Sequence, residues 1–189
     1  MAQLTEVRFH GRGGQGAKTA GYILAVAAAE EGWKINAFPE YGAERRGAPM
    51  RSYVRISDEP IRLRSSVKRP DVVGVLDDTL LTSENVTDGM PDGAVLVVNT
   101  DQSPEQIRQQ LSNPNVKVFV VNATRIAMDT IGRPIPNTPM LGAMAKAAGL
   151  ASLQALKNAV HERLGGKLSQ AALEANYAAL ERAYEEVTQ

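Results

Sequence analysis

The chain has 189 residues, of which 43% are hydrophobic and 22% charged, as in soluble globular proteins that bury a sizeable core. Its formal net charge of +0 provides no general basic field for nucleic acid, and its longest apolar run, residues 21–29, is far too short to span a bilayer. It has no cysteine and only two histidines, His10 and His161, so we expect neither disulfides nor an iron–sulfur or zinc site on this chain, and we expect a cytoplasmic protein.

The first third of the chain predicts strand, helix, strand and hairpin. Residues 4–10 alternate polar and apolar side chains, which is typical of a strand, and the alanine-rich residues 17–32 have apolar residues at helical spacing. Residues 33–38 predict a second strand, followed by a loop over residues 39–49. Two alternating runs then flank residues 57–60 and predict a β-hairpin, in which Arg55 would face Arg62 and Tyr53 would face Arg64.

Three short apolar runs at residues 71–77, 94–100 and 116–123 predict strands buried on both faces of a mostly parallel sheet. Ser103, Pro104 and Gln106 predict a helix that begins with a capping box. From about residue 123 the pattern becomes helical, and the last helix carries one apolar stripe, which most often packs on its own domain: Leu173, Tyr177, Leu180, Tyr184 and Val187.

These elements predict an α/β fold: an open, mostly parallel sheet with an antiparallel hairpin insertion and a helical C-terminal part. We expect a single domain over residues 1–189, with the α/β core at about 4–122 and the helical part at about 123–187.

A glycine-rich loop lies between the first predicted strand and the first helix. Gly11, Gly13 and Gly16 match G-x-G-x-x-G, and a helix N-terminus offers unpaired N–H groups and positive potential to an anion, to which Arg12 and Lys18 could add charge. A dinucleotide site would also need an acid after the second strand. Glu40, 24 residues beyond Gly16, lies at that place, but no second crossover helix follows. The glycines could instead serve only a tight turn.

The neutral chain contains one strongly basic segment between residues 45 and 69. Like charges directly opposite each other destabilise a strand pair, so the predicted hairpin favours contact with a ligand or a subunit over a merely solvated face. The cations are Arg45, Arg46, Arg51, Arg55, Arg62, Arg64, Lys68 and Arg69, against the acids Asp58 and Glu59.

No residue of the chain lies in a recognisable nucleophile motif, so we expect no catalytic residue and no metal site. His161 is expected at the surface or an interface. His10, at the end of the first predicted strand, could point into the glycine loop or serve the structure alone.

Three segments together carry a resemblance to a known family: "GRGGQG" at 11–16, "YGAERRGAPMRSYVRIS" at 41–57 and "PNTPMLGA" at 136–143. In this order, and over about residues 4–185, the chain resembles the gamma subunit of the 2-oxoacid:acceptor oxidoreductases, the pyruvate:ferredoxin oxidoreductase family. Over its whole length the sequence resembles the phenylglyoxylate dehydrogenase type slightly more closely than the other types.

The resemblance implies a subunit of an enzyme that converts a 2-oxoacid and coenzyme A to acyl-CoA and carbon dioxide. The 2-oxoacid could be pyruvate, 2-oxoglutarate, a branched-chain acid or an aryl acid such as phenylglyoxylate. Thiamine diphosphate, magnesium and iron–sulfur clusters would belong to alpha, beta and delta-type partner subunits. Electrons would pass to ferredoxin or to an NAD-reducing flavin subunit, and the gamma part would pack over the active site and help to receive coenzyme A.

Carried over by motif, the resemblance implies a set of candidate coenzyme A-binding residues, for which backbone donors and arginines suit phosphates. A free-standing dinucleotide-binding oxidoreductase and a pure interaction subunit remain as alternatives. The candidate residues are Gly11, Arg12, Gly13, Gly14, Gln15, Gly16, Glu44, Arg45, Arg46, Gly47, Asn137 and Thr138.

Overall fold

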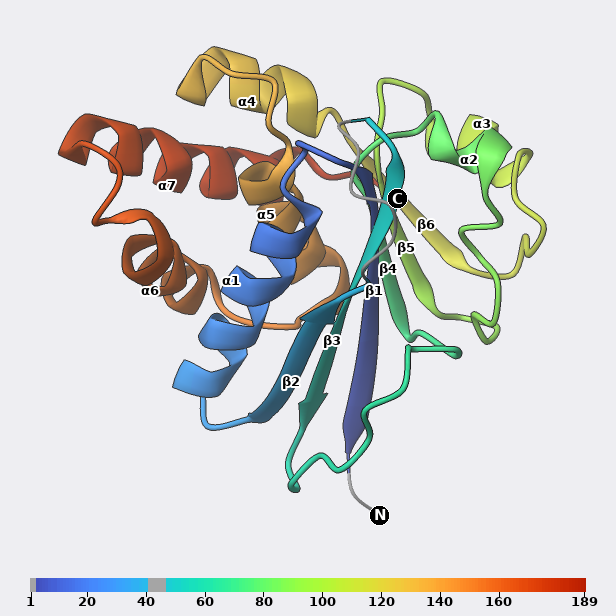
Figure 1. Cartoon of the computed structure of the whole chain (residues 1–189). Coiled ribbons are helices and arrows are strands. Elements are labelled where there is room, and N and C mark those ends of the chain that lie inside the picture. The colour runs from blue at the N-terminus through green and yellow to red at the C-terminus, as the bar shows by residue number, and fades with distance from the viewer. Residues whose placement is uncertain (1–2, 41–46) are drawn as a thin grey trace.

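The computed structural model describes residues 3–40 and 47–189, and its centre is a mixed sheet of six strands in the order β2-β3-β1-β4-β5-β6 (Figure 1). β1, β4, β5 and β6 run parallel, whereas β3 is antiparallel to both of its neighbours, β1 and β2. The predicted α/β class with a mostly parallel sheet is confirmed. The strands are β1 Leu4–Arg12, β2 Lys34–Pro39, β3 Pro49–Ser57, β4 Val72–Val75, β5 Val95–Asn99 and β6 Lys117–Val121.

Helices lie on both faces of the sheet. Helices α1, α4, α5, α6 and α7 lie on one side, and the short α2 and α3 lie on the other (Figure 1). The predicted capping box of α3 is confirmed, since Ser103 and Gln106 each accept a hydrogen bond from the other's backbone N–H. The helices are α1 Ala17–Glu30, α2 Leu80–Ser83, α3 Pro104–Arg108, α4 Ala123–Ile131, α5 Asn137–Ala148, α6 Leu153–Leu164 and α7 Gln170–Glu186.

The sheet separates two apolar cores. The larger core joins the sheet to the five-helix side and includes Phe9, Ile23 and Leu141, while the smaller core lies under α2 and α3 and includes Leu80 and Leu96. Because β4 and β5 contribute side chains to both cores, they are buried on both faces, as their continuous apolar runs predict. The α7 stripe packs on the larger core, as expected.

The predicted hairpin over residues 50–66 is wrong. Residues 58–71 form no strand, and β3 pairs with β1 and β2 instead. Arg55 therefore faces Glu6 of β1 rather than Arg62, and its Nε donates to the Glu6 carboxylate at 2.7 Å. The physical reason is charge pairing, because β1 offers a carboxylate where the hairpin would have placed a second cation.

Candidate functional site

The glycine loop lies at the carboxyl edge of the sheet, where β1 ends and α1 begins. Gly14 and Gly16 have φ angles of 100° and 84°, a conformation that favours glycine. Gly16 is the N-cap residue of α1, and no side-chain hydrogen bond caps this helix. The backbone here therefore forms a turn that leads into a 14-residue helix whose first N–H groups receive no side-chain cap.

The side chains of the loop tie it to the segment that follows β4. Gln15 accepts a hydrogen bond from the Arg12 N–H at 2.7 Å and donates one to Asp77 at 2.6 Å. The Arg12 guanidinium donates to the Thr79 hydroxyl at 2.7 Å and lies 3.4 Å from Asp77. Arg12 is thus held by groups of its own chain, and its charge is balanced by a carboxylate.

The structure brings together residues from all three of the segments that carry the resemblance. Gly13 donates to the Ala48 carbonyl at 2.9 Å, and Gly47 donates back to the Gly13 carbonyl at 3.1 Å. A Cβ on Gly16 would lie 2.7 Å from the amide nitrogen of Asn137, at the start of α5. The glycine loop therefore contacts described residues of both the second and the third segment.

Other candidate residues lie elsewhere. Thr138 is buried, and its hydroxyl donates to Asn176 of α7 at 3.0 Å, so its side chain is used in helix packing. Gly11 is buried too, where a Cβ would meet the Ala17 methyl at 3.2 Å. Glu44, Arg45 and Arg46 lie outside the described residues.

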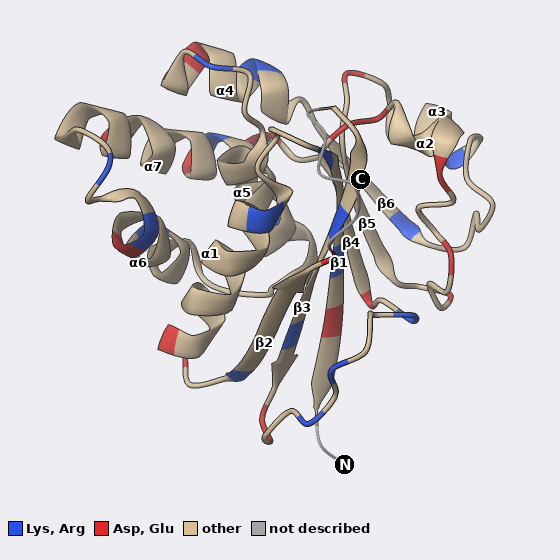
Figure 2. Ribbon diagram, in the orientation of Figure 1, with Lys and Arg blue, Asp and Glu red and all other residues tan. Residues whose placement is uncertain are grey.

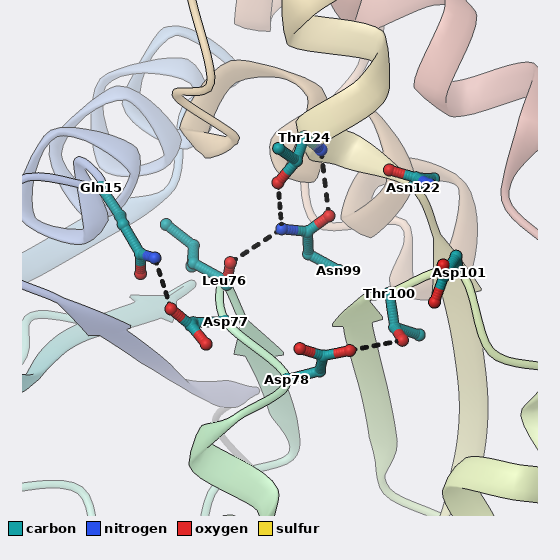
Figure 3. Close-up of a pocket in the computed structure, with 9 residues that line it drawn as sticks. All are labelled: Gln15, Leu76, Asp77, Asp78, Asn99, Thr100, Asp101, Asn122 and Thr124. Atoms are coloured by element: carbon teal, nitrogen blue, oxygen red, sulfur yellow. Dashed lines mark hydrogen bonds between the residues drawn. The ribbon is translucent and has the colours of Figure 1, made fainter.

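A polar cavity of about 290 Å³ adjoins the glycine loop at the carboxyl ends of β4, β5 and β6 (Figure 3). Asn99 is central to it, donating to the Leu76 carbonyl and the Thr124 hydroxyl, both at 2.8 Å. Asp78 accepts from the Thr100 hydroxyl at 2.7 Å. The lining residues are Gln15, Leu76, Asp77, Asp78, Asn99, Thr100, Asp101, Asn122 and Thr124.

Carboxylates dominate the charge of this cavity. Partial burial acts to raise the pKa of Asp77, but hydrogen bonds from Thr79 and Gln15 and the charge of Arg12 hold it below its usual value. Of the residues that line the cavity, only Gln15 was predicted to belong to a site, although a signal for the others was present: polar residues follow each apolar strand run directly. In parallel strands such residues meet at one edge of the sheet.

β1 and β3 have a polar, largely buried face on the side of the sheet away from the larger apolar core. His10 is fully buried and its Nδ1 lies 2.9 Å from Glu84, while its Nε2 has no hydrogen-bond partner within the described part of the chain. Burial lowers the pKa of His10 despite the hydrogen bond to Glu84, so the imidazole is neutral at pH 7. Of the two roles expected for His10, the structure supports the structural one.

Glu40, the candidate ribose ligand, belongs to the same polar face. Its carboxylate accepts a hydrogen bond from the Tyr53 hydroxyl, and burial together with this hydrogen bond raises the pKa of Tyr53 to about 12. Glu40 therefore already has a partner within the chain, which disfavours a dinucleotide site. His161 is exposed, as expected, and lies 3.3 Å from the Tyr177 hydroxyl.

No group of three or more metal-ligating side chains occurs among residues 3–40 and 47–189, and no helix in that part is long and apolar enough to cross a membrane. The amides, hydroxyls and carboxylates at the carboxyl edge suit the binding of a polar molecule. A glycine loop between β1 and α1, with a cavity beside it at the carboxyl ends of the strands, is typical of open α/β proteins, in which ligands commonly bind at that edge.

Comparison with known proteins agrees with this class. The family described as "Pyruvate ferredoxin/flavodoxin oxidoreductase" matches residues 6–186. Pyruvate synthase subunit PorC of Thermotoga maritima is 50% identical over 182 residues, covering 96% of this chain and 94% of its own. The common gamma subunit of the pyruvate/ketoisovalerate oxidoreductases of Pyrococcus furiosus is 46% identical, with 96% of each chain covered.

A crystal structure of the pyruvate oxidoreductase subunit PORC from Thermotoga maritima superimposes with a TM-score of 0.88 at 44% identity, covering 98% of both chains. The chain belongs to the pyruvate ferredoxin/flavodoxin oxidoreductase family. The resemblance drawn from the three sequence segments is thereby confirmed.

Proposed function

We propose that this chain is the gamma subunit of a multi-subunit 2-oxoacid:acceptor oxidoreductase, which lies over the active-site region and helps to bind coenzyme A. The observation that carries the proposal is the meeting of the three resemblance segments, where Gly13 hydrogen-bonds with Gly47 and Ala48 while Gly16 packs on Asn137. The names of relatives that match nearly the whole chain support the subunit assignment.

Coenzyme A offers two chemically different parts to this surface. Its phosphates suit the uncapped start of α1 together with Arg45 and Arg46, because helix N-termini and guanidinium groups both bind phosphate. They do not suit the cavity, where Asp77, Asp78 and Asp101 would repel them. The cavity, rich in hydrogen-bonding groups, better suits the uncharged amide and hydroxyl groups of the coenzyme's arm.

The 2-oxoacid is selected by other subunits in this proposal. The name of the Pyrococcus furiosus relative assigns one common gamma subunit to oxidoreductases of pyruvate and of ketoisovalerate. Such names favour pyruvate or a branched-chain 2-oxoacid over phenylglyoxylate as the substrate here. The alpha, beta and delta-type partners would hold thiamine diphosphate, magnesium and iron–sulfur clusters, and the family description favours ferredoxin or flavodoxin over an NAD-reducing subunit as acceptor.

The test uses the complex purified from cells that produce all of its subunits. Replacing both Arg45 and Arg46 with alanine should raise the apparent KM for coenzyme A about tenfold or more, because charged hydrogen bonds contribute roughly 1.5–3 kcal/mol each. Thiamine and iron contents should not change. A matched control replaces Arg133 and Lys167, two exposed cations on other parts of the chain.

Two outcomes would contradict the proposal. Coenzyme A kinetics that are unchanged in the Arg45/Arg46 variant would remove the coenzyme-binding role. If the chain purified without the other subunits and with a bound nucleotide, the subunit assignment itself would be contradicted, because a gamma subunit should purify as part of the complex.

A further inference from the structure

A second charged surface lies at the other end of β1 from the glycine loop. We call residues 61–69, between β3 and β4, the basic loop. Its four cations, Arg62, Arg64, Lys68 and Arg69, are all exposed, and none of them forms an ion pair with any residue of the described ranges. Figure 2 shows blue segments, which mark Lys and Arg, along the chain beside the start of β1. Within the described ranges these four neighbouring cations therefore have no counter-charge in contact, although they follow one another within eight residues.

The backbone of the basic loop is fixed from beneath by one buried cation. Arg55 of β3 has a side chain that is only 2% exposed, and its Nε pairs with Glu6 at 2.7 Å. Its two remaining nitrogens donate to the carbonyls of Leu63 and Ser66, each at 3.5 Å. The guanidinium thus holds the loop through its main chain, so the loop cations project from an ordered backbone.

The far end of the basic loop is fixed by close packing. Val67 is buried, and a Cβ on Gly89 would lie 1.8 Å from the Lys68 carbonyl oxygen, so the two backbones touch. A surface that is already ordered loses little conformational entropy when a partner binds. Arg55, Val67 and Gly89 therefore make the loop a pre-formed display of positive charge.

An apolar side chain stands among these cations. Leu63 is 49% exposed between Arg62 and Arg64, and Leu4, at the same end of the sheet, is 38% exposed. Arginine is enriched at protein interfaces, and the exposed leucines add apolar contact area beside the arginines of the loop. Nucleic acid would require a broader positive field than a chain of net charge +0 supplies.

The basic loop is also separate from the proposed coenzyme site. It lies beside the start of β1, whereas the glycine loop follows Arg12 at its end, a distance of about 26 Å along the strand at roughly 3.3 Å per residue. We infer that the basic loop is a docking surface for a carboxylate-rich patch on another subunit of the oxidoreductase. This inference rests on the proposed function, because it assumes that the chain works within a complex.

The first test introduces the photo-crosslinking residue p-benzoylphenylalanine at position 64 in the complete, purified complex. A control complex carries it at Met128 of α4, which is 48% exposed and lies away from the basic loop. We expect irradiation to join position 64 to a carboxylate-rich segment of another subunit, identified by mass spectrometry of the crosslinked peptides. Position 128 should not join that segment.

Other crosslinking results would overturn the inference. These results are no crosslink from position 64 in an intact complex, or a crosslink to a segment that lacks carboxylates or to a second copy of this chain. An intact, active complex that shows any of them would leave the proposed function standing, so the two failures can be distinguished.

Charge reversal provides an independent measurement. The double variant R62E and R64E should weaken subunit association about tenfold or more and make the complex dissociate at lower salt, because both attractions become repulsions. The control variant R133E and K167E makes the same change of charge on exposed positions elsewhere. Equal salt stability of the R62E/R64E and parent complexes, or equal weakening by both variants, would overturn the inference.

Discussion

Gly142 of α5 permits a close backbone approach between α5 and α7, and Gly142→Ala should destabilise the protein. A Cβ at this position would lie 2.1 Å from the Leu180 carbonyl oxygen and 2.9 Å from its carbonyl carbon. Ordinary contact begins at 3.4 Å, so the two helices would have to separate by about 1.3 Å. The obstacle is main chain rather than a side chain, so rotamer changes cannot relieve it.

Overpacking of a core costs roughly 1–3 kcal/mol, and alanine recovers about 1 kcal/mol of helix propensity relative to glycine. Because α7 must move as a unit, we expect the upper end of this cost and a net loss of about 2 kcal/mol. At roughly 2–4 °C per kcal/mol for a chain of this size, Tm should fall by about 4–8 °C.

Urea and thermal unfolding followed by circular dichroism would measure the effect of Gly142→Ala. Gly166→Ala is the matched control, since a Cβ there would meet nothing within 4 Å. If Gly142→Ala were as stable as the parent, the argument that the α5–α7 spacing is fixed by a missing Cβ would be refuted.

Three further predictions concern other named positions. Gly16→Ala should lose about 1–2 kcal/mol of stability more than Gly32→Ala in urea unfolding, because both have positive φ but only Gly16 touches Asn137; equal losses would contradict this. Arg55→Met should lower the free energy of unfolding by about 3–5 kcal/mol, because it leaves the Glu6 carboxylate unpaired. It should also speed hydrogen exchange in residues 61–69, because the loop carbonyls lose their donor. Unchanged exchange would show that Arg55 does not hold the loop. Burial lowers the pKa of His10 below the unfolded value of about 6.5, so the unfolded chain binds the extra proton and stability falls as pH drops below 6.5, by up to about 1.4 kcal/mol per pH unit. His10→Asn should show a shallower loss between pH 7 and 5.5, and an identical slope would exclude His10 as the cause.

The sheet class and most of the elements could be predicted because each depends on local pattern. The apolar runs at β4 and β5 report burial on both faces, and Ser103 with Gln106 reports a helix start, without knowledge of the rest of the chain. The three segments of the resemblance likewise indicated residues that do meet at the glycine loop.

The place of β3 could not be predicted, because alternation specifies which side chains share a face but not which strand lies alongside. Residues 61–65 alternate as well as residues 50–56 do, yet only the latter form a strand. The partners of β3 are distant in sequence, as the bond from Arg55 to Glu6, 49 positions away, illustrates. The cavity at Asn99 was missed for the same reason, since its residues come together only through the order of the strands.

β3 connects the two surfaces proposed for partners. It begins at Pro49, paired with Arg12 beside the glycine loop, and ends at Ser57, paired with Leu4 near the basic loop. Its hydrogen-bonded neighbours on both sides prevent sliding, since a slip of one residue would turn Arg55 into the apolar core. β3 therefore forms a rigid connection between the surface proposed for a partner subunit and the surface proposed for coenzyme A. A movement imposed at one end would reach the other as displacement of the whole strand.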